Sequence, residues 1–135
     1  MNWQGGVVLE TNGDLRFIAA ASAVGILRAP HIVPVPGMVL PAAGIAATDA
    51  GVVAVLAVGG AATEELVVCE FDGNAVALAG GRVLATGCFE TVDGGSGDVM
   101  FRGRRATRLD VRALCLEAET AIWMSRAAHD DARRA

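Results

Sequence analysis

Short apolar runs separated by turn signals recur along the chain. The first two runs, Val7–Leu9 and Leu15–Ile18, flank Thr11-Asn12-Gly13-Asp14. An Asn-Gly pair between apolar runs is a strong signal for a two-residue β-hairpin loop, because both central residues of that turn take positive φ. The pattern therefore predicts a β-hairpin at the start of the chain.

The remaining runs before residue 110 predict many short strands, so the protein is expected to be mainly β. Asp72-Gly73-Asn74 and Gly103 are predicted turns, and Ala19–Leu27 is a short apolar segment. The link His31–Gly37 must be extended, because each proline pushes the preceding residue away from helical geometry. Short strands with regular turns favour small barrels or a sandwich. The further predicted strands are Gly51–Val58, Leu66–Phe71, Ala75–Leu78, Val83–Phe89, Val99–Arg102 and Arg105–Leu109.

An internal repeat relates two of the predicted hairpins. Val7-Val8-Leu9-Glu10 aligns with Val67-Val68-Cys69-Glu70, and Gly13 aligns with Gly73. Two units of the same design predict two similar subdomains in one chain. The alternative is chance similarity between hairpins.

After residue 110 the apolar residues follow a helical period. Asp110 is a candidate N-cap for a helix over about residues 111–124. The charged segment 125–135 is expected to fray. The apolar face of the helix either docks on its own domain or fits a groove on a partner. That face contains Leu114, Ala118, Ala121 and Ile122.

Composition and charge indicate a globular chain that binds protein rather than nucleic acid. The 135 residues are 53% hydrophobic, which is too apolar for a disordered chain and is enough for a buried core. The net charge of −4 is unfavourable for contacts with phosphates. An arginine cluster is either a solvated hairpin edge or a protein-binding patch, since no aromatic residue alternates with it for base stacking. The cluster consists of Arg102, Arg104, Arg105, Arg108 and Arg112.

No segment predicts secretion, membrane insertion or a metal site. The apolar stretch Ala50–Thr63 is shorter than the about 20 residues that span a bilayer. No basic region precedes an apolar one at the N-terminus, so a secretory signal is not expected. The three cysteines (Cys69, Cys88 and Cys115) lie far apart without a CxxC motif, which favours reduced thiols in the cytoplasm.

The sequence also lacks the residue types and spacings that an enzyme active site requires. His31 lies in the proline-rich link and His129 in the predicted tail, and no serine stands in a G-x-S-x-G motif. Cys69 lies in a predicted buried strand, where a thiol usually acts as a small hydrophobe. The loop Asp93–Asp98 lacks the Lys-Ser/Thr of a P-loop and has too few carboxylates for Ca²⁺. We therefore expect neither catalysis nor a cofactor.

The order of these elements resembles the CheW family of chemotaxis adaptors. The stretch VVLETNGDLRFIAAASAVGILRAPHIVPVPG has the family's strand, glycine turn, strand, "ILR" segment and Pro-Val-Pro-Gly link. Val52–Leu56 corresponds to the family's valine strand, ELVVCEFDGNAVALAGGRVLATG to its second barrel and Arg108–Leu114 to its strand-to-helix step. The resemblance extends over residues 6–116.

This resemblance implies a fold and a function. The fold would be two five-stranded β-barrel subdomains, about residues 6–58 and 64–116, around a shared core within a single domain of residues 1–124. The function would be a non-enzymatic scaffold that joins a histidine kinase to chemoreceptors. Because each barrel end in the family offers a hydrophobic contact to another barrel, homo-oligomers or mixed rings are also expected.

Four positions depart from the pattern of the family. Typical members carry Asn and Arg before the valine strand and Pro and Asp within it, where this chain has Ala47, Asp49, Ala54 and Ala57. Asp49 reverses the local charge, and charge complementarity sets specificity at interfaces. We therefore favour a divergent adaptor with a different protein partner. The alternative is a small β-barrel module that has lost chemoreceptor coupling and binds a different protein partner or a small ligand.

Partner contacts are expected in three places. Val35 and Met38 lie in the proline-rich link, Ala47, Asp49 and Val52 in the loop that leads into the valine strand, and Trp123 in the helix. Tryptophan is enriched among interface anchors, so Trp3 is a further candidate.

Overall fold

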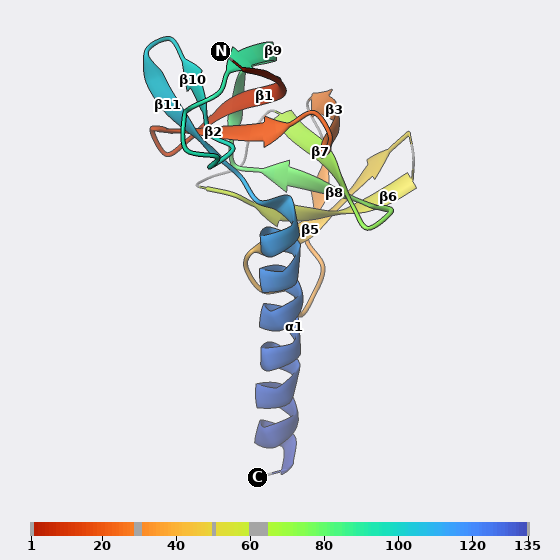
Figure 1. Cartoon of the computed structure of the whole chain (residues 1–135). Coiled ribbons are helices and arrows are strands. Elements are labelled where there is room, and N and C mark those ends of the chain that lie inside the picture. The colour runs from red at the N-terminus through yellow and green to blue at the C-terminus, as the bar shows by residue number, and fades with distance from the viewer. Residues whose placement is uncertain (1, 29–30, 50, 60–64, 135) are drawn as a thin grey trace.

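The computed structural model describes residues 2–28, 31–49, 51–59 and 65–134, with side chains described as far as residue 124. These residues form short strands and one C-terminal helix (Figure 1). The protein is thus mainly β, as the sequence predicts. In chain order the elements are β1 (Trp3–Thr11), β2 (Asp14–Ala19), β3 (Ala23–Arg28), β4 (Ile32–Val33), β5 (Ala42–Thr48), β6 (Gly51–Ala57), β7 (Glu65–Phe71), β8 (Asn74–Ala79), β9 (Arg82–Glu90), β10 (Val99–Phe101), β11 (Arg104–Arg108) and α1 (Val111–Arg134).

The strands form two sheets that do not follow the predicted division of the chain. One sheet has five strands in the order β10-β11-β2-β1-β9, and the other has six in the order β3-β7-β8-β6-β5-β4. The parallel pairs β2–β11 and β6–β8 each join strands from the two predicted subdomains. The boundary expected between residues 58 and 64 therefore does not separate the sheets, and the strand counts are five and six rather than five each.

The five-stranded sheet closes around an aromatic core. A bridge between Thr91 and Val99 joins the end of β9 to β10, so that the two edges of this sheet meet. Inside it, the rings of Phe17 and Phe89 meet edge to face with their centroids 6.0 Å apart, and Phe101 packs on Phe89 in the same way. Phe17 is fully buried.

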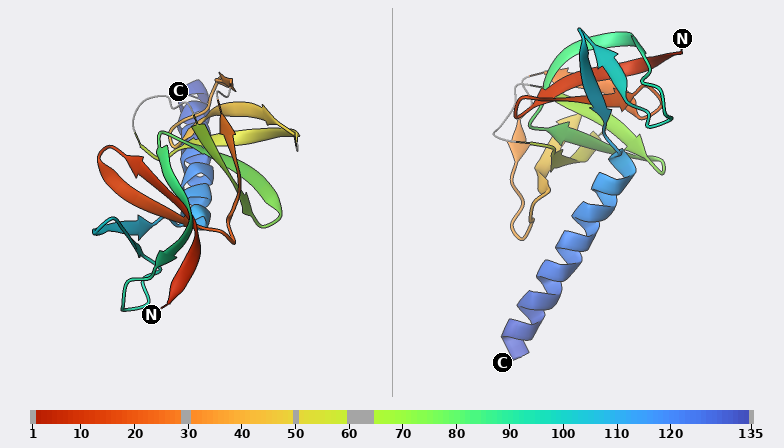
Figure 2. Two further views of the ribbon diagram at one scale, coloured as in Figure 1. Left: turned by 90° about the horizontal axis from the view of Figure 1, so that it is seen from above. Right: turned by 60° about the vertical axis from the view of Figure 1, so that its left-hand side comes forward.

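The six-stranded sheet has an interior of smaller side chains. Its buried cluster consists of Ala46, Val53, Val55, Leu66, Ala77 and Ala79. A third cluster lies between the two sheets and the helix, and it draws on both sheets through residues such as Ile18 and Leu78. The helix begins at this shared core and projects away from the sheets (Figure 2).

Hairpins with positive φ at both central residues bear out the turn predictions. Asn12 and Gly13 have φ of 52° and 84°, and Asp72 and Gly73 have φ of 49° and 78°. These values identify type I′ turns, which match the twist of the flanking strands. The registers also agree at the predicted offset, because Val8 pairs with Phe17 where Val68 pairs with Ala77. The repeat predicted from the sequence is therefore confirmed for these two hairpins.

Other segments are strands where the sequence does not predict them. Ala23–Arg28 and Ile32–Val33 form β3 and β4, and Ala42–Thr48 forms β5. Alanine and glycine dominate β5, and such residues carry little strand propensity. Its strand conformation depends on pairing with β6, so the predicted loop at residues 47–52 is a hairpin closed by the pair Thr48–Gly51.

The helix is longer than predicted. It begins at Val111, as expected, but continues to Arg134 instead of ending near residue 124. Neither glycine nor proline occurs in this segment, so no residue type that breaks helices interrupts it. The segment predicted to fray is therefore the last part of α1.

Candidate interaction surfaces

The helix is capped and packed at its N-terminal half. The Asp110 carboxylate accepts a hydrogen bond from the backbone N–H of Ala113 at 3.0 Å, as expected of an N-cap. The guanidinium of Arg112 lies 6.0 Å from the centroid of the Phe71 ring. One face of the helix packs against the shared core through Val111, Leu114, Cys115, Ala118 and Ile122. This arrangement confirms that the predicted apolar face docks on its own domain as far as Ile122.

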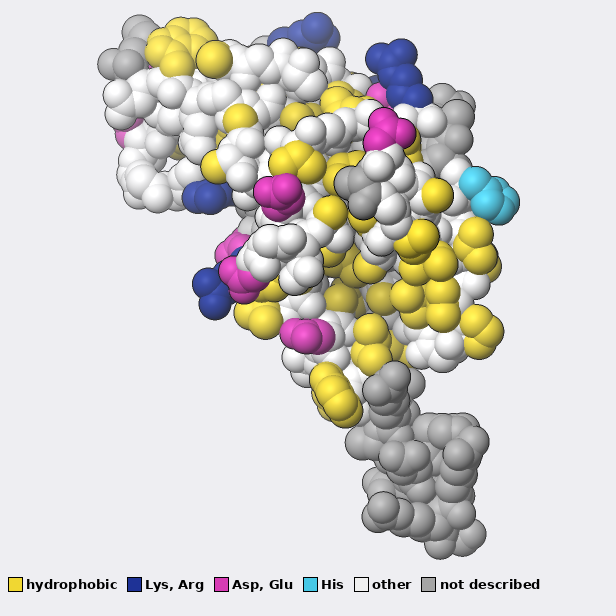
Figure 3. Space-filling view, turned by 90° about the vertical axis from the view of Figure 1, so that its right-hand side faces the viewer, with side chains coloured by type: hydrophobic (Ala, Val, Ile, Leu, Met, Phe, Trp, Pro, Cys, Tyr) yellow, Lys and Arg dark blue, Asp and Glu magenta, His cyan; other side chains and the backbone are white. Residues whose placement is uncertain are grey.

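A groove of about 240 Å³ remains between α1 and the six-stranded sheet. Its lining is mostly apolar, with Asn74 and Glu119 as the polar residues. Figure 3 shows hydrophobic side chains gathered on the side of the molecule that this sheet forms. The groove is lined by Met38, Ala42, Ala54, Leu56, Phe71, Asn74, Val76, Cys115, Ala118, Glu119 and Ile122.

Two thiols lie in apolar surroundings here: Cys115 lines the groove, and Cys69 is buried in the shared core. Burial, with a smaller contribution from Cys115, raises the pKa of Cys69 to about 12. Burial, together with the nearby Glu119, also raises the pKa of Cys115. Because a thiolate is the reactive form of cysteine, both groups are poor nucleophiles at neutral pH.

One of the two contacts predicted in the proline-rich link, Met38, lies at the groove. The N–H of Met38 donates to the carbonyl of Val35 at 3.1 Å, which turns the link back toward β5. Met38 lines the groove, and Val35 is half-buried. Leu40, which sequence reasoning missed, lies between the link and β5 and is 75% exposed. Leu40 is exposed because of the path that the chain takes before β5, and the sequence pattern does not predict this path.

The other predicted contacts form the tip of the β5–β6 hairpin. Ala47 pairs directly with Val52, and Asp49 lies in the turn between them. The Thr48 hydroxyl donates to the carbonyl of Gly51 at 2.9 Å and closes the turn. All three predicted residues are exposed, and 69% of the surface of Val52 is accessible. The fold therefore brings these three residues together.

These two groups lie at opposite ends of β5. The link enters the strand at Ala42, and the hairpin tip follows Thr48. A strand of this length spans roughly 20 Å. The hairpin tip and the rim of the groove are therefore separate surfaces of one molecule.

The two tryptophans are also far apart. Trp123 is 64% exposed and directly follows Ile122, which lines the groove. Trp3 is exposed as well and begins β1 in the other sheet. The N-terminus and the end of the helix lie at opposite ends of the molecule (Figure 1). Trp123 can therefore contribute to the groove rim, whereas Trp3 cannot.

Part of the arginine cluster has a structural role. Arg105 donates from Nε to the carboxylate of Asp98 at 2.7 Å, and the backbone N–H of Arg108 donates to the same carboxylate at 2.8 Å. These bonds, the one from Arg108 first, lower the pKa of Asp98. Arg102 lies over the ring of Phe101 at 4.9 Å. The cluster thus holds the glycine-rich loop against β11.

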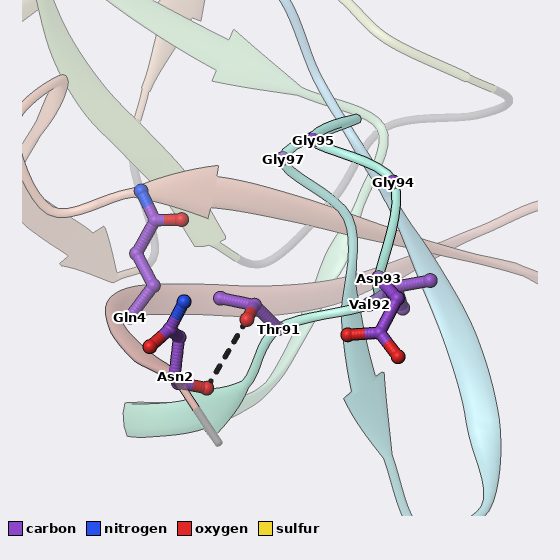
Figure 4. Close-up of a pocket in the computed structure, with 8 residues that line it drawn as sticks. All are labelled: Asn2, Gln4, Thr91, Val92, Asp93, Gly94, Gly95 and Gly97. Carbon is purple, nitrogen blue, oxygen red and sulfur yellow. Dashed lines mark hydrogen bonds between the residues drawn. The ribbon is translucent and has the colours of Figure 1, made fainter.

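A polar pocket of about 340 Å³ lies beside the same loop (Figure 4). The Thr91 hydroxyl donates to the carbonyl of Asn2 at 3.2 Å, while Asp93 projects from the loop. Each lining residue is exposed or half-buried. A small-molecule site usually has convergent polar groups in an enclosed apolar cavity, and this pocket has neither.

Among the described residues, no three His, Cys, Asp or Glu side chains are grouped as metal ligands. Within the same part of the chain, no helix combines the length and the hydropathy needed to cross a bilayer.

Comparison with known proteins gives a match in structure but not in sequence. Neither the protein-family models nor the curated proteins contain a match to this chain. The fold is similar to the crystal structure of the scaffolding protein TtCheW from Thermoanaerobacter tengcongensis, with a TM-score of 0.69. The two chains are 12% identical, and the similarity covers 82% of this chain and 91% of the other. The chain therefore has a CheW-like fold, and the resemblance predicted from the order of its elements is confirmed at the level of the fold.

Proposed function

We propose that this protein is a non-enzymatic adaptor in a chemosensory-type signalling system. The observation that carries the proposal is the CheW-like fold, which it shares with a scaffolding protein along most of both chains. The partners that fit the proposal are a histidine kinase, a chemoreceptor or another regulatory protein.

The separation of the two surfaces supports an adaptor role. An adaptor must bind two proteins at once, and roughly 20 Å of β5 separates the hairpin tip from the groove rim. Each surface exposes large apolar side chains, Val52 at the tip and Leu40 and Trp123 near the groove. Exposed apolar patches on soluble proteins mark interaction sites.

The charge at the hairpin tip supports a divergent partner. Asp49 is exposed at the turn, where the family pattern has a cation. Like charges facing each other across an interface are costly, so a surface that matches the family's cation would reject Asp49. We propose that the partner presents a basic or neutral surface at this point.

Affinity purification of the tagged full chain from its native lysate, followed by mass spectrometry, tests the adaptor role. The wild type is expected to recover a histidine kinase or a chemoreceptor. Val52→Asp is expected to lose a partner that binds the tip, and Trp123→Ala a partner that binds the groove rim. Thr86→Asp, an exposed substitution on β9, is the matched control and is expected to retain both.

Two results would contradict the proposal. One is the recovery by the wild type of neither kind of signalling protein. The other is equal recovery of all partners by wild type, Val52→Asp and Trp123→Ala, which would place binding elsewhere. Asp49→Arg sharpens the test of charge, because it is expected to change which partners are recovered rather than to abolish recovery.

A further inference from the structure

The glycine-rich loop between β9 and β10 presents a serine hydroxyl to solvent. Ser96 is exposed, and Gly95 and Gly97, both labelled in Figure 4, stand on its two sides. Because glycine has no side chain, the backbone next to this hydroxyl is open to an approaching protein. The other exposed hydroxyls of the described side chains lie within strands or the helix, where the backbone is already paired; they belong to Thr86, Thr107 and Thr120.

The hydroxyl hydrogen of Ser96 is free to be replaced. The Ser96 Oγ accepts a hydrogen bond from the backbone N–H of Asp98 at 3.3 Å and another from Nη2 of Arg105 at 3.3 Å. Within the described part of the chain, no acceptor receives its own hydrogen. A group attached to this oxygen in place of the hydrogen therefore breaks no hydrogen bond of the fold.

Two guanidinium groups lie next to the same oxygen. Arg105 already bonds to it, and the side chain of Arg108 passes over the loop, because a Cβ added at Gly97 would lie 3.1 Å from Nη1 of Arg108. Among the described residues, that guanidinium has neither a hydrogen-bond acceptor nor an ion pair. The nearby carboxylate of Asp98 is itself bound by Arg105 Nε and by the backbone N–H of Arg108. Two cations and one carboxylate thus surround Ser96.

We propose that Ser96 is phosphorylated by a serine/threonine kinase that uses ATP, and that Arg105 and Arg108 hold the phosphate. In the reaction the Ser96 Oγ attacks the γ-phosphorus of ATP, the bond from that phosphorus to the bridging oxygen of ADP breaks, and the hydroxyl proton passes to the base of the kinase. The phosphate carries a charge of about −1.5 to −2 and three acceptor oxygens. Guanidinium groups bind such oxygens in pairs.

The expected consequence is a loop held more firmly against β11. The phosphate gives Arg108 an ionic partner and adds charge-assisted bonds to the one that Arg105 already makes. Because two cations face one carboxylate, attraction outweighs the repulsion from Asp98. The proposal rests on this loop alone and does not depend on the adaptor role, since the loop is a different element from the hairpin tip and the groove rim.

The first test is transfer of phosphate from ATP. The full chain is incubated with ATP, Mg²⁺ and its native lysate, purified again and digested with trypsin. The fragment of residues 83–102 contains Thr86, Thr91 and Ser96, so two other hydroxyls are internal controls. Mass spectrometry is expected to find one phosphoryl group, on Ser96, and none on this fragment in Ser96→Ala. A fragment without phosphate, or with phosphate on Thr86 or Thr91 instead, would overturn the proposal.

The second test asks whether the two arginines hold the phosphate. With phosphoserine incorporated at position 96 of the full chain, phosphorus NMR is expected to show a second phosphate pKa below that of free phosphoserine, because nearby cations favour the dianion. Arg108→Gln is expected to raise this pKa, whereas Arg82→Gln, at an exposed position of β9, is the matched control and is expected to leave it unchanged.

Two results of the titration would contradict the proposal. One is a phosphate pKa equal to that of free phosphoserine, and the other is a pKa that Arg108→Gln does not change. Circular dichroism shows whether each variant is folded.

Discussion

The two sheets share a hairpin design but differ in what fills and borders them. At equivalent positions of the repeat, the five-stranded sheet has Phe17 and the six-stranded sheet has Ala77, and both residues are fully buried. The first sheet closes on itself around three aromatic rings, while the second, among the described residues, ends at the edge strands β3 and β4 and carries the hairpin tip and the groove. One sheet is thus filled by large aromatic side chains, whereas the other carries the two surfaces that we propose for partners.

The largest expected effect is at the centre of the closed sheet. Phe17→Ala removes a fully buried ring and is expected to lower the free energy of unfolding by about 3–5 kcal/mol. Val55→Ala, in the core of the six-stranded sheet, removes two methyl groups and is expected to cost about 2 kcal/mol. Denaturation with urea measures both. If Val55→Ala lowered the free energy of unfolding as much as Phe17→Ala or more, the two sheets would not differ in their contribution to stability.

The next effect concerns the loop that joins β9 to β10. Asp98→Ala removes the acceptor for Arg105 and for the backbone N–H of Arg108, and the expected loss in free energy of unfolding is about 1.5–3 kcal/mol. Asp93→Ala, at an exposed position of the same loop, is the control and is expected to change stability by less than about 0.5 kcal/mol.

The same carboxylate makes part of the stability depend on pH. The pKa of Asp98 is lowered from 3.8 in the folded state, so its contribution is present above that pH and is lost as the pH falls through the lower folded pKa. The difference in stability between wild type and Asp98→Ala is expected to be constant near neutral pH and to shrink below about pH 4. A difference that does not change with pH would show that the ionised form is not the stabilising one.

The smallest effect concerns the helix whose first half packs against the shared core. Asp110→Ala removes the N-cap and is expected to lower the free energy of unfolding by about 1 kcal/mol, whereas Asp110→Asn retains an acceptor and most of the stability. Thermal unfolding followed by circular dichroism measures the loss. Equal stability of the two variants would mean that capping does not hold the start of α1.

The sequence predicted the candidate interaction surfaces only in part. Val52 and Asp49 could be placed on one exposed segment, because a turn next to a valine run is a local feature. The exposure of Ile26 and Leu40 could not, because exposure depends on which strands lie beside them. The separation of the hairpin tip from the groove rim likewise follows from β5, a strand whose small residues give no strand signal.

The sequence alone determines the features that depend on neighbouring residues. The Asn12–Gly13 and Asp72–Gly73 turns, the strands that flank them and the cap at Asp110 follow from local conformational preference and short-range hydrogen bonds. Tertiary structure decides the rest: the parallel pairs β2–β11 and β6–β8, the closure of one sheet and the strand order of the other. These features depend on contacts between residues far apart in the chain, whose free energy no local pattern of side chains encodes.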